Sequence, residues 1–331
     1  MKVSKQAPYT QVRFDGSPDE VNAQWERARR GGIGGSDVAA IMGISKFRSP
    51  YEVWLDKTGR VEHQDISGKQ AVEWGNRLED TVARKFADDH PELSVKRRNA
   101  MLVSKSRPWA FANLDRVATD ENGKHYVLEC KTAGERRKHD WDDGVPDYYQ
   151  TQVVHYLGVT GFSGAWVAVL IGGQDYREFY IPRDEEDIAV ISEIVDAFWH
   201  DRVEGDQMPP MVGLESESQA LAGVYGDWRD EYVQSADEDL ISADCDIETL
   251  ADVKRKIEEL TKEKRRIEDC LKSRIGDRKG IMTQTNRVTW ARSEYDRFDS
   301  KRFKEEQPEL FARYTVRAKR DGGLRIASRK G

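Results

Sequence analysis

The sequence has only three cysteines among 331 residues, and this scarcity excludes several classes of protein. Cys130, Cys245 and Cys270 lie far apart and form no Cys-x-x-Cys pair. They therefore cannot build a four-cysteine zinc or iron–sulfur site, and they do not resemble the disulfide framework of a small secreted domain. We expect the chain to reside in a reducing cytoplasm.

Long apolar stretches are also absent. No run of eighteen apolar residues occurs, so the sequence predicts no membrane-spanning helix. Residues 1–10 lack the apolar core of a signal peptide. The six histidines show no His-Glu-x-x-His spacing, and the glycines of residues 31–35 fit neither a P-loop nor a dinucleotide-binding fingerprint. Several common metalloprotease and nucleotide-binding motifs are thus excluded.

Charge is distributed unevenly along the chain, whose formal net charge is −7. Residues 1–210 carry 28 basic and 35 acidic side chains, and residues 211–250 carry 1 basic and 11 acidic ones. Residues 251–331 carry 24 basic and 14 acidic side chains, a net charge of +10. This basic region suits a DNA backbone or an acidic protein surface, although a solvated charged helix explains the composition equally well.

Alternating helical and strand patterns predict an α/β core with a mixed central sheet flanked by helices over residues 1–205. The first 15 residues are expected to form a polar arm. Helices are predicted at 19–30, 37–42, 51–58, 68–89, 147–159 and 185–203, and strands at 93–95, 101–104, 109–114, 125–131, 165–171 and 177–181. Ser36 is predicted to cap the second helix. The Asn122-Gly123 pair predicts a hairpin turn.

Two further segments follow this core. Residues 206–246 are rich in Gly, Pro, Ser and acidic residues and predict an acidic linker. Residues 247–331 predict a helical, basic C-terminal region. Its heptad seam consists of Val253, Ile257, Leu260, Lys264, Ile267 and Leu271. Three heptads are compatible with a coiled coil and equally with a helix packed on the core of this chain.

The most informative residues are Asp115, Glu129 and Lys131. We expect Asp115 to end one strand of the predicted hairpin. Side chains alternate along the second strand, so Glu129 and Lys131 share one face, while Leu128 and Cys130 share the other. Two carboxylates then meet a lysine, an arrangement that suits Mg²⁺ and a phosphate substrate. The short pattern alone is more typical of an ordinary surface hairpin with an ion pair.

Two helical residues strengthen the catalytic interpretation. Glu79 shares a helix face with the apolar residues Val82 and Phe86, and a carboxylate there is costly unless it is paired or near a cation. Gln152 shares a face with Tyr156 and could bond to water or phosphate, although such a glutamine is more often an ordinary helix residue.

A basic and aromatic segment, residues 136–141, follows the strand that carries Lys131. Its Trp141 could contact a DNA backbone or stack on a base. The alternative is a loop whose charges are simply solvated.

Taken in order, these motifs resemble the PD-(D/E)XK nuclease core and, within that superfamily, the YqaJ-type viral recombinase family of lambda exonuclease relatives. The opening motif of that family is similar to residues 29–43, followed by 49–54 and 57–59. The other motifs are Gly75 to Asp80, Asp115, Glu129 to Lys131, and Gln152 to Gly161. The resemblance covers residues 20–205. One departure is that Leu114 stands where the nominal motif has proline.

The resemblance implies a role for each site residue. Asp115, Glu129 and the backbone carbonyl of Cys130 would bind Mg²⁺, with Mn²⁺ as a substitute. Lys131 would act on the attacking water. Glu79 would contact the metal directly or through water, and Gln152 would position that water or Lys131.

The opening motif carries two further residues implied by the resemblance. In relatives that degrade DNA from a 5′ end, an arginine and a serine hold the terminal phosphate, and Arg29 and Ser36 occupy the matching positions. The chemistry is suitable, because arginine binds phosphate in a bidentate manner and a helix N-terminus offers backbone donors.

The resemblance therefore implies a Mg²⁺-dependent hydrolase that degrades double-stranded DNA 5′ to 3′ and leaves a 3′ single strand for recombination by annealing. It further implies a phage or prophage origin, double-stranded DNA ends as substrate, a single-strand annealing protein as partner and a homotrimer. Two alternatives remain open, namely a restriction-like or structure-specific DNA endonuclease and a non-catalytic DNA-binding module.

Overall fold

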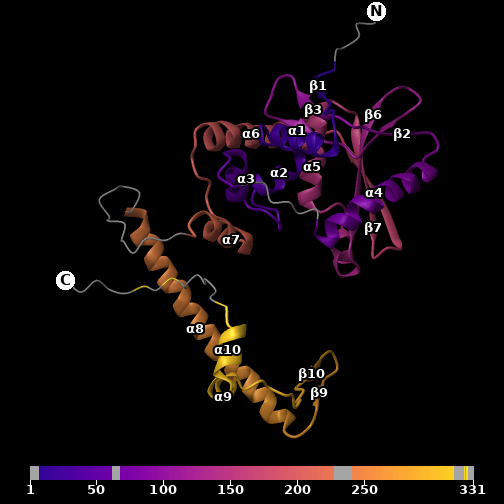
Figure 1. Ribbon diagram of the computed structural model, residues 1–331. Coiled ribbons are helices and arrows are strands. Elements are labelled where there is room, and N and C mark those ends of the chain that lie inside the picture. Colours follow the sequence, from indigo (N-terminus) through magenta and orange to yellow (C-terminus); the bar gives the residue numbers. More distant parts are fainter. Residues whose placement is uncertain (1–6, 62–67, 227–240, 317–323, 325, 327–331) are drawn as a thin grey trace, which may run out of the picture. The chain divides into compact units, whose positions relative to one another are not determined.

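The computed structural model describes residues 7–61, 68–226 and 241–316, together with Leu324 and Ile326 (Figure 1). Contacts within the chain divide it into two compact units, residues 1–227 and 228–331. We describe each unit by itself. The division falls beyond residue 205, where the sequence predicts the end of the core.

A five-stranded mixed sheet forms the centre of the first unit, which confirms the predicted α/β class. Its strand order is β2-β5-β6-β7-β8, and β6 and β7 are parallel while all other neighbours are antiparallel. These strands are β2 (Ser94–Arg97), β5 (Arg116–Thr119), β6 (His125–Ala133), β7 (Gly164–Ile171) and β8 (Asp175–Pro182). A parallel pair needs a long crossover, and α5 (Asp147–Thr160) supplies it.

The remaining helices of this unit surround the sheet (Figure 1). They are α1 (Pro18–Arg30), α2 (Gly35–Ile41), α3 (Pro50–Lys57), α4 (Gln70–Asp89), α6 (Glu185–Ala197), α7 (Glu215–Val224), the 3₁₀ helix η1 (Glu135–Trp141) and the π-helical segment η2 (Phe198–Glu204). Local sequence explains where two of them begin. Ser17 and Ser49 each form a capping box with the glutamate three residues later, and a proline follows each cap.

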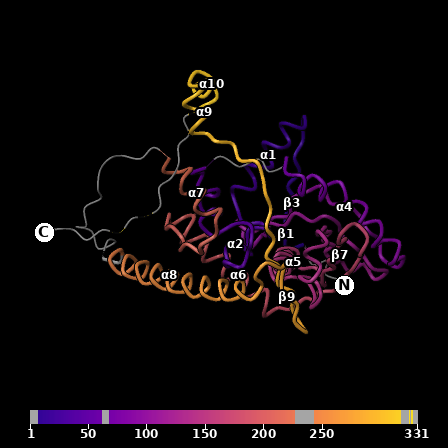
Figure 2. Tube along the Cα trace, turned by 90° about the horizontal axis from the view of Figure 1, so that it is seen from below, coloured from indigo at the N-terminus to yellow at the C-terminus, as the bar shows by residue number. Residues whose placement is uncertain are grey.

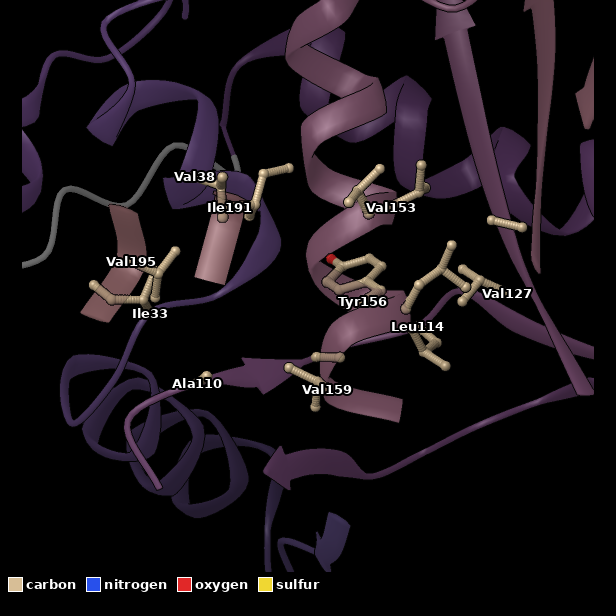
Figure 3. Packing of buried hydrophobic residues seen from close by; sticks show 14 of the residues in the cluster. Ile33, Val38, Ala110, Leu114, Val127, Val153, Tyr156, Val159, Ile191 and Val195 are labelled. Carbon is tan, nitrogen blue, oxygen red and sulfur yellow. The ribbon is translucent and has the colours of Figure 1, made fainter. Parts of the chain in front are cut away.

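The two faces of the sheet are covered by different helices. On one face, Phe86 of α4 packs with Leu128 of β6 in a small apolar cluster. On the other face, α5 packs against Val127 as part of the main core. Figure 3 shows Val153 and Tyr156 of α5 between sheet residues on one side and residues of α2 and α6 on the other. The alternation predicted for the strand 125–131 is thus confirmed, and α5 lies at the centre of the core.

Several predicted elements differ from the structure. The predicted polar arm contains β1 (Tyr9–Val12), which pairs with β3 (Met101–Ser104) in a separate sheet that also includes β4 (Phe111–Ala112). The predicted strand 109–114 is wrong because the chain changes sheets between Ala112 and Arg116. Asp115 therefore precedes β5 instead of ending a strand. The hairpin joins β5 to β6 through the predicted turn, where Gly123 has a φ of +76°.

Part of the predicted linker packs on the first unit. Helix α7 contacts α3, and Ser216 donates a hydrogen bond of 2.8 Å to Glu52. Glu217 is buried and accepts backbone hydrogen bonds from Val212 and Gly213. Residues 215–224 are therefore structured instead of forming a plain connector.

The second unit contains the 35-residue helix α8 (Ile241–Ile275), which appears as one continuous helix in Figure 2. The remaining described elements are β9 (Gly280–Met282), β10 (Arg287–Thr289), α9 (Ser300–Glu306) and α10 (Pro308–Tyr314). The strands form a two-stranded antiparallel hairpin. The seam residues Val253, Ile257, Leu260 and Ile267 are 43–69% exposed. In the described parts of the chain, no helix is long and apolar enough to cross a membrane.

Candidate active site

Strand β6 and helix α5 bring three of the predicted site residues together. The Lys131 Nζ donates to Glu129 Oε1 at 2.7 Å and to Gln152 Oε1 at 3.2 Å. The Gln152 Nε2 donates to the same Glu129 oxygen at 2.6 Å and to the Tyr156 hydroxyl at 3.0 Å. Each of the three side chains therefore contacts the other two. Through Gln152, helix α5 fixes the Lys131 and Glu129 side chains of β6.

Asp115 joins this group through the backbone of β6. Its Oδ2 accepts a hydrogen bond of 2.8 Å from the Cys130 N–H. Burial and the Glu129 carboxylate raise the pKa of Asp115 to about 8, against the opposite effect of Lys131. Burial opposes the charge on Lys131, but Glu129 and Asp115 outweigh it and raise the lysine pKa. Two carboxylates thus share a site that has one compensating cation.

One oxygen of Glu129 is left without a partner. Among the described residues, Glu129 Oε2 is buried and accepts no hydrogen bond, a situation that costs free energy in a folded protein. A divalent cation held by Asp115 and Glu129 would satisfy this oxygen, and Mg²⁺ often uses one or two carboxylates plus a substrate phosphate. The described residues contain no group of three or more His, Cys, Asp or Glu side chains placed to hold a metal.

The Cys130 side chain lies on the other face of β6. Its thiol packs in the small cluster with Phe86, and burial raises its pKa. The thiol is therefore no ligand at the carboxylate pair. The ligand role predicted for Cys130 concerns its backbone carbonyl and stays a prediction.

Glu79 has a strong partner that sequence reasoning missed. Arg116 is buried, and its Nη1 donates to Glu79 Oε1 at 2.5 Å and to the Asp115 carbonyl at 2.6 Å. Its Nη2 donates to Asp80 at 3.1 Å. Arg116 thus links α4 to the start of β5 and holds Glu79. Arg116 directly follows Asp115 in the sequence, and this position is the one signal by which sequence reasoning could have found it.

A second charged cluster surrounds the opening motif. Asp37 is fully buried and contacts Lys57 at 2.8 Å, Arg48 at 2.8 Å and Arg29 at 3.8 Å. Burial opposes ionisation, but these three cations outweigh it and lower the pKa of Asp37. Arg48 also contacts Asp56 at 2.8 Å. Sequence reasoning did not single out this network, although Arg29, Asp37 and Lys57 lie within the opening motif and Arg48 directly precedes one of its segments.

The structure places the two predicted phosphate-binding residues on neighbouring elements. Arg29 lies in the last turn of α1 and is half-buried, with its guanidinium over the Trp25 ring. Ser36 is exposed in the first turn of α2. The prediction that Ser36 caps this helix is wrong, because the helix begins two residues earlier than predicted, at Gly35, and Gly34 occupies the cap.

Gly35 connects the opening motif to the catalytic group. A Cβ at this position would lie 2.5 Å from the Tyr156 ring and 2.9 Å from Gln152 Cγ. Only glycine allows α2 and α5 to approach this closely. The residue before Ser36 therefore packs directly against the glutamine that holds Glu129 and Lys131.

Comparisons with known proteins agree on one family. Residues 24–163 match the YqaJ-like viral recombinase domain. The chain is 32% identical over 312 residues to the uncharacterized protein YqaJ of Bacillus subtilis (strain 168), covering 93% of this chain and 94% of that protein. The chain belongs to the YqaJ-like viral recombinase domain family.

Two solved structures show a weaker similarity. An alkaline exonuclease from Laribacter hongkongensis is 18% identical, with a TM-score of 0.45, over 61% of this chain and 99% of that one. A phage-related exonuclease from Haemophilus somnus 129PT is 14% identical, with a TM-score of 0.39, over 55% of this chain and 99% of that one. Similarities this low do not transfer a fold or an activity.

Proposed function

We propose that this chain is a metal-dependent deoxyribonuclease that hydrolyses phosphodiester bonds at the group formed by Asp115, Glu129, Lys131 and Gln152. The buried Glu129 Oε2, which lacks a hydrogen-bond partner among the described residues, is the observation that carries this proposal. Buried polar atoms without a partner are uncommon in folded proteins, and a bound ion is one explanation for such an atom.

Each residue has a distinct part in the proposed reaction. Asp115, Glu129 and the carbonyl of Cys130 would hold Mg²⁺, or Mn²⁺ in its place, and the bound ion would polarise the scissile phosphate and lower the pKa of water. Lys131 would orient the attacking water and offset negative charge that develops on the phosphate. Gln152 fixes the Lys131 ammonium and the Glu129 carboxylate relative to each other.

The position of Glu79 makes its proposed part indirect. Its pairing with Arg116, which also bonds to the Asp115 carbonyl, allows it to orient the backbone at Asp115. The Glu79 carboxylate would also contact the metal, directly or through water.

We further propose that the substrate is a double-stranded DNA end and that degradation runs 5′ to 3′. Arg29 supports this choice because its 3.8 Å contact with Asp37 is loose, while Arg48 and Lys57 already hold that carboxylate at 2.8 Å. The Arg29 guanidinium can therefore turn to a terminal phosphate. The exposed Ser36 hydroxyl would supply a further donor.

The family to which the chain belongs suggests the biological setting. A viral recombinase domain fits the production of 3′ single strands in a phage or prophage recombination system, with a single-strand annealing protein as partner. The exposed apolar seam of α8 favours an oligomer, for which we propose the homotrimer implied by the sequence resemblance.

The test uses the purified full chain with Mg²⁺ and two DNA substrates, one linear with 5′-phosphates and one covalently closed circle. We expect cleavage of the linear DNA only. Glu129→Gln should lower the rate by about 10³-fold or more, by analogy with lost charge stabilisation at other sites, and should leave DNA binding in place. Glu121→Gln, on the exposed turn before β6, is the matched control.

Different outcomes would select different functions. Cleavage of the closed circle would identify an endonuclease, and binding without any cleavage would identify a DNA-binding module. Full activity in Glu129→Gln would refute the site. For the end-recognition step, we expect Arg29→Ala and Ser36→Ala to remove any preference for a 5′-phosphate over a 5′-hydroxyl end.

A further inference from the structure

An exposed aromatic residue is linked to the candidate active site through two tyrosine rings. Phe47 lies in the loop between α2 and α3 and is 58% exposed. A single exposed phenylalanine is common on protein surfaces. The Phe47 ring packs edge-to-face with the Tyr148 ring of α5, with ring centroids 5.9 Å apart and planes at 79°.

The loop that carries Phe47 is fixed on both sides. The Ser45 hydroxyl accepts hydrogen bonds from the backbone N–H groups of Phe47 and Arg48, at 3.1 and 3.3 Å. The Arg48 guanidinium is bound to the buried Asp37 and to Asp56, each at 2.8 Å. The structure therefore presents the Phe47 ring on an ordered loop.

Two cations flank this aromatic pair. The Arg137 guanidinium carbon lies 5.6 Å from the centre of the Phe47 ring, and the Lys46 Nζ lies 5.7 Å from the centre of the Tyr148 ring. Asp140 contacts both Lys46, at 3.5 Å, and Arg137, at 3.6 Å, so its charge is offset locally. The cluster thus combines an exposed ring with basic side chains.

A row of aromatic rings connects this cluster to the catalytic lysine. The rings of Tyr148 and Tyr149 are 4.4 Å apart, and the Lys131 Nζ lies 4.6 Å from the centre of the Tyr149 ring. Tyr149 also stacks on Trp141 at 5.6 Å. Base stacking by Trp141, one of the two readings of the segment 136–141, is wrong because Trp141 is buried.

We infer that Phe47 is a substrate-positioning residue that stacks on a nucleobase of the DNA bound at Lys131. The inference rests on the proposed nuclease function. Unpaired nucleobases, as at a melted DNA end, stack on aromatic faces whatever their sequence, and nearby cations meet the phosphates.

The test compares Phe47→Ala and Phe47→Trp with the wild-type full chain on linear double-stranded DNA. Because the variant loses stacking on one base, Phe47→Ala should raise KM about tenfold and change kcat much less. Phe47→Trp should restore KM. The control is Tyr180→Ala, an aromatic residue of β8 that is 46% exposed and packs with Trp166.

The fluorescence of a modified base gives a readout that would not change if Phe47 had only a structural role. With 2-aminopurine at successive positions of one strand, we expect quenching at one position in Glu129→Gln, a background chosen to prevent cleavage. The added Phe47→Ala change should remove this quenching. The slope of log affinity against log salt should stay the same for Phe47→Ala, because stacking releases no counterions, and should flatten by about one for Arg137→Ala.

The outcomes separate this inference from the proposed function. If the wild-type chain cuts DNA but Phe47→Ala keeps the wild-type KM and the same quenching, the stacking role is refuted and the nuclease remains. An equal rise of KM in Tyr180→Ala would also refute it. If the wild-type chain neither cuts nor binds DNA, the proposed function itself fails.

Discussion

At the scale of single residues, the candidate site is defined by charges that are not fully paired. Lys131 is the only cation in hydrogen-bond contact with Glu129 among the described residues. Asp115 has a raised pKa because two carboxylates and one ammonium share a buried space. Such an excess of negative charge destabilises an empty site and favours binding of a cation.

Lys131→Ala should lower kcat far more than it changes KM, because the lysine acts on charge that develops in the transition state. Steady-state kinetics on linear DNA would measure both constants. Lys124→Ala, an exposed lysine just before β6, is the control and should behave as wild type. A variant that raised only KM would show Lys131 to be a binding residue.

His155 makes stability depend on pH. It is buried, its Nε2 donates to the Phe111 carbonyl at 3.0 Å, and burial lowers its pKa from 6.5 to about 4. Between these two values the unfolded chain binds a proton that the folded chain does not. The folded state is therefore stabilised above pH 6.5 and loses this stabilisation as pH falls toward 4.

The expected loss from His155 is about 3 kcal/mol over that range, since one pKa unit corresponds to about 1.4 kcal/mol. Urea unfolding of wild type and His155→Gln at several pH values would test this. The variant should show a flatter dependence on pH. Equal slopes in both proteins would mean that other groups cause the dependence.

At the scale of elements, the approach of α2 to α5 decides whether the site is assembled. Gly35→Ala would place a methyl group 2.5 Å from the Tyr156 ring and 2.9 Å from Gln152. Overpacking of this kind costs about 1–3 kcal/mol and should move Gln152 away from Glu129 and Lys131. We expect both the unfolding free energy and kcat to fall.

The control for Gly35→Ala is Gly223→Ala in α7. No atom lies within 4 Å of the added Cβ there, so stability should change by less than about 1 kcal/mol and activity should be unaffected. If Gly35→Ala kept wild-type kcat, the position of Gln152 would not depend on α2.

The sequence predicted elements better than it predicted their connections. The helix predicted at 51–58 and the alternation predicted for β6 follow from neighbouring residues, and both agree with the structure. The switch between sheets after Ala112 depends on pairing with β3 and β6, which no local pattern reveals. The partner of Glu79 also comes from an element distant in the sequence, the start of β5.

Among the site residues, those on β6 were the most predictable. Strand alternation alone places Glu129 and Lys131 on one face. The role of Phe47 had no signal in the sequence, because the ring that supports it, Tyr148, lies about a hundred residues later. The burial of Trp141 likewise results from packing against Tyr149 and Phe179.

At the scale of the whole molecule, the two units carry different properties. The proposed catalytic residues all lie in the first unit, whereas the basic residues after position 250 lie in the second. Within the second unit, α8 exposes the apolar seam of Val253, Ile257, Leu260 and Ile267. Covering an apolar seam stabilises an amphipathic helix, so this seam indicates an apolar partner surface, in this chain, in another copy of it or in another protein.

A chain ending at Ser242 should keep a folded, DNA-cutting first unit, whereas a chain ending at residue 205 should be less stable. The shorter fragment loses α7, whose Ser216 bonds to Glu52 and whose Leu221 packs on the main core. Thermal unfolding of the two fragments would measure the difference. Equal stability would show that α7 does not support the core.

Comparison of the longer fragment with the full chain also shows what the basic second unit binds. If this unit holds phosphates, its removal should flatten the slope of log DNA affinity against log salt, because fewer counterions are released. If the α8 seam instead holds another copy of the chain, that slope should barely change while the sedimentation mass falls. Leu260→Glu in the full chain, at the most exposed position of the seam, should then lower the mass in the same way. An insoluble or inactive fragment would show that the second unit is needed for the catalytic core, which would contradict the proposed separation of roles.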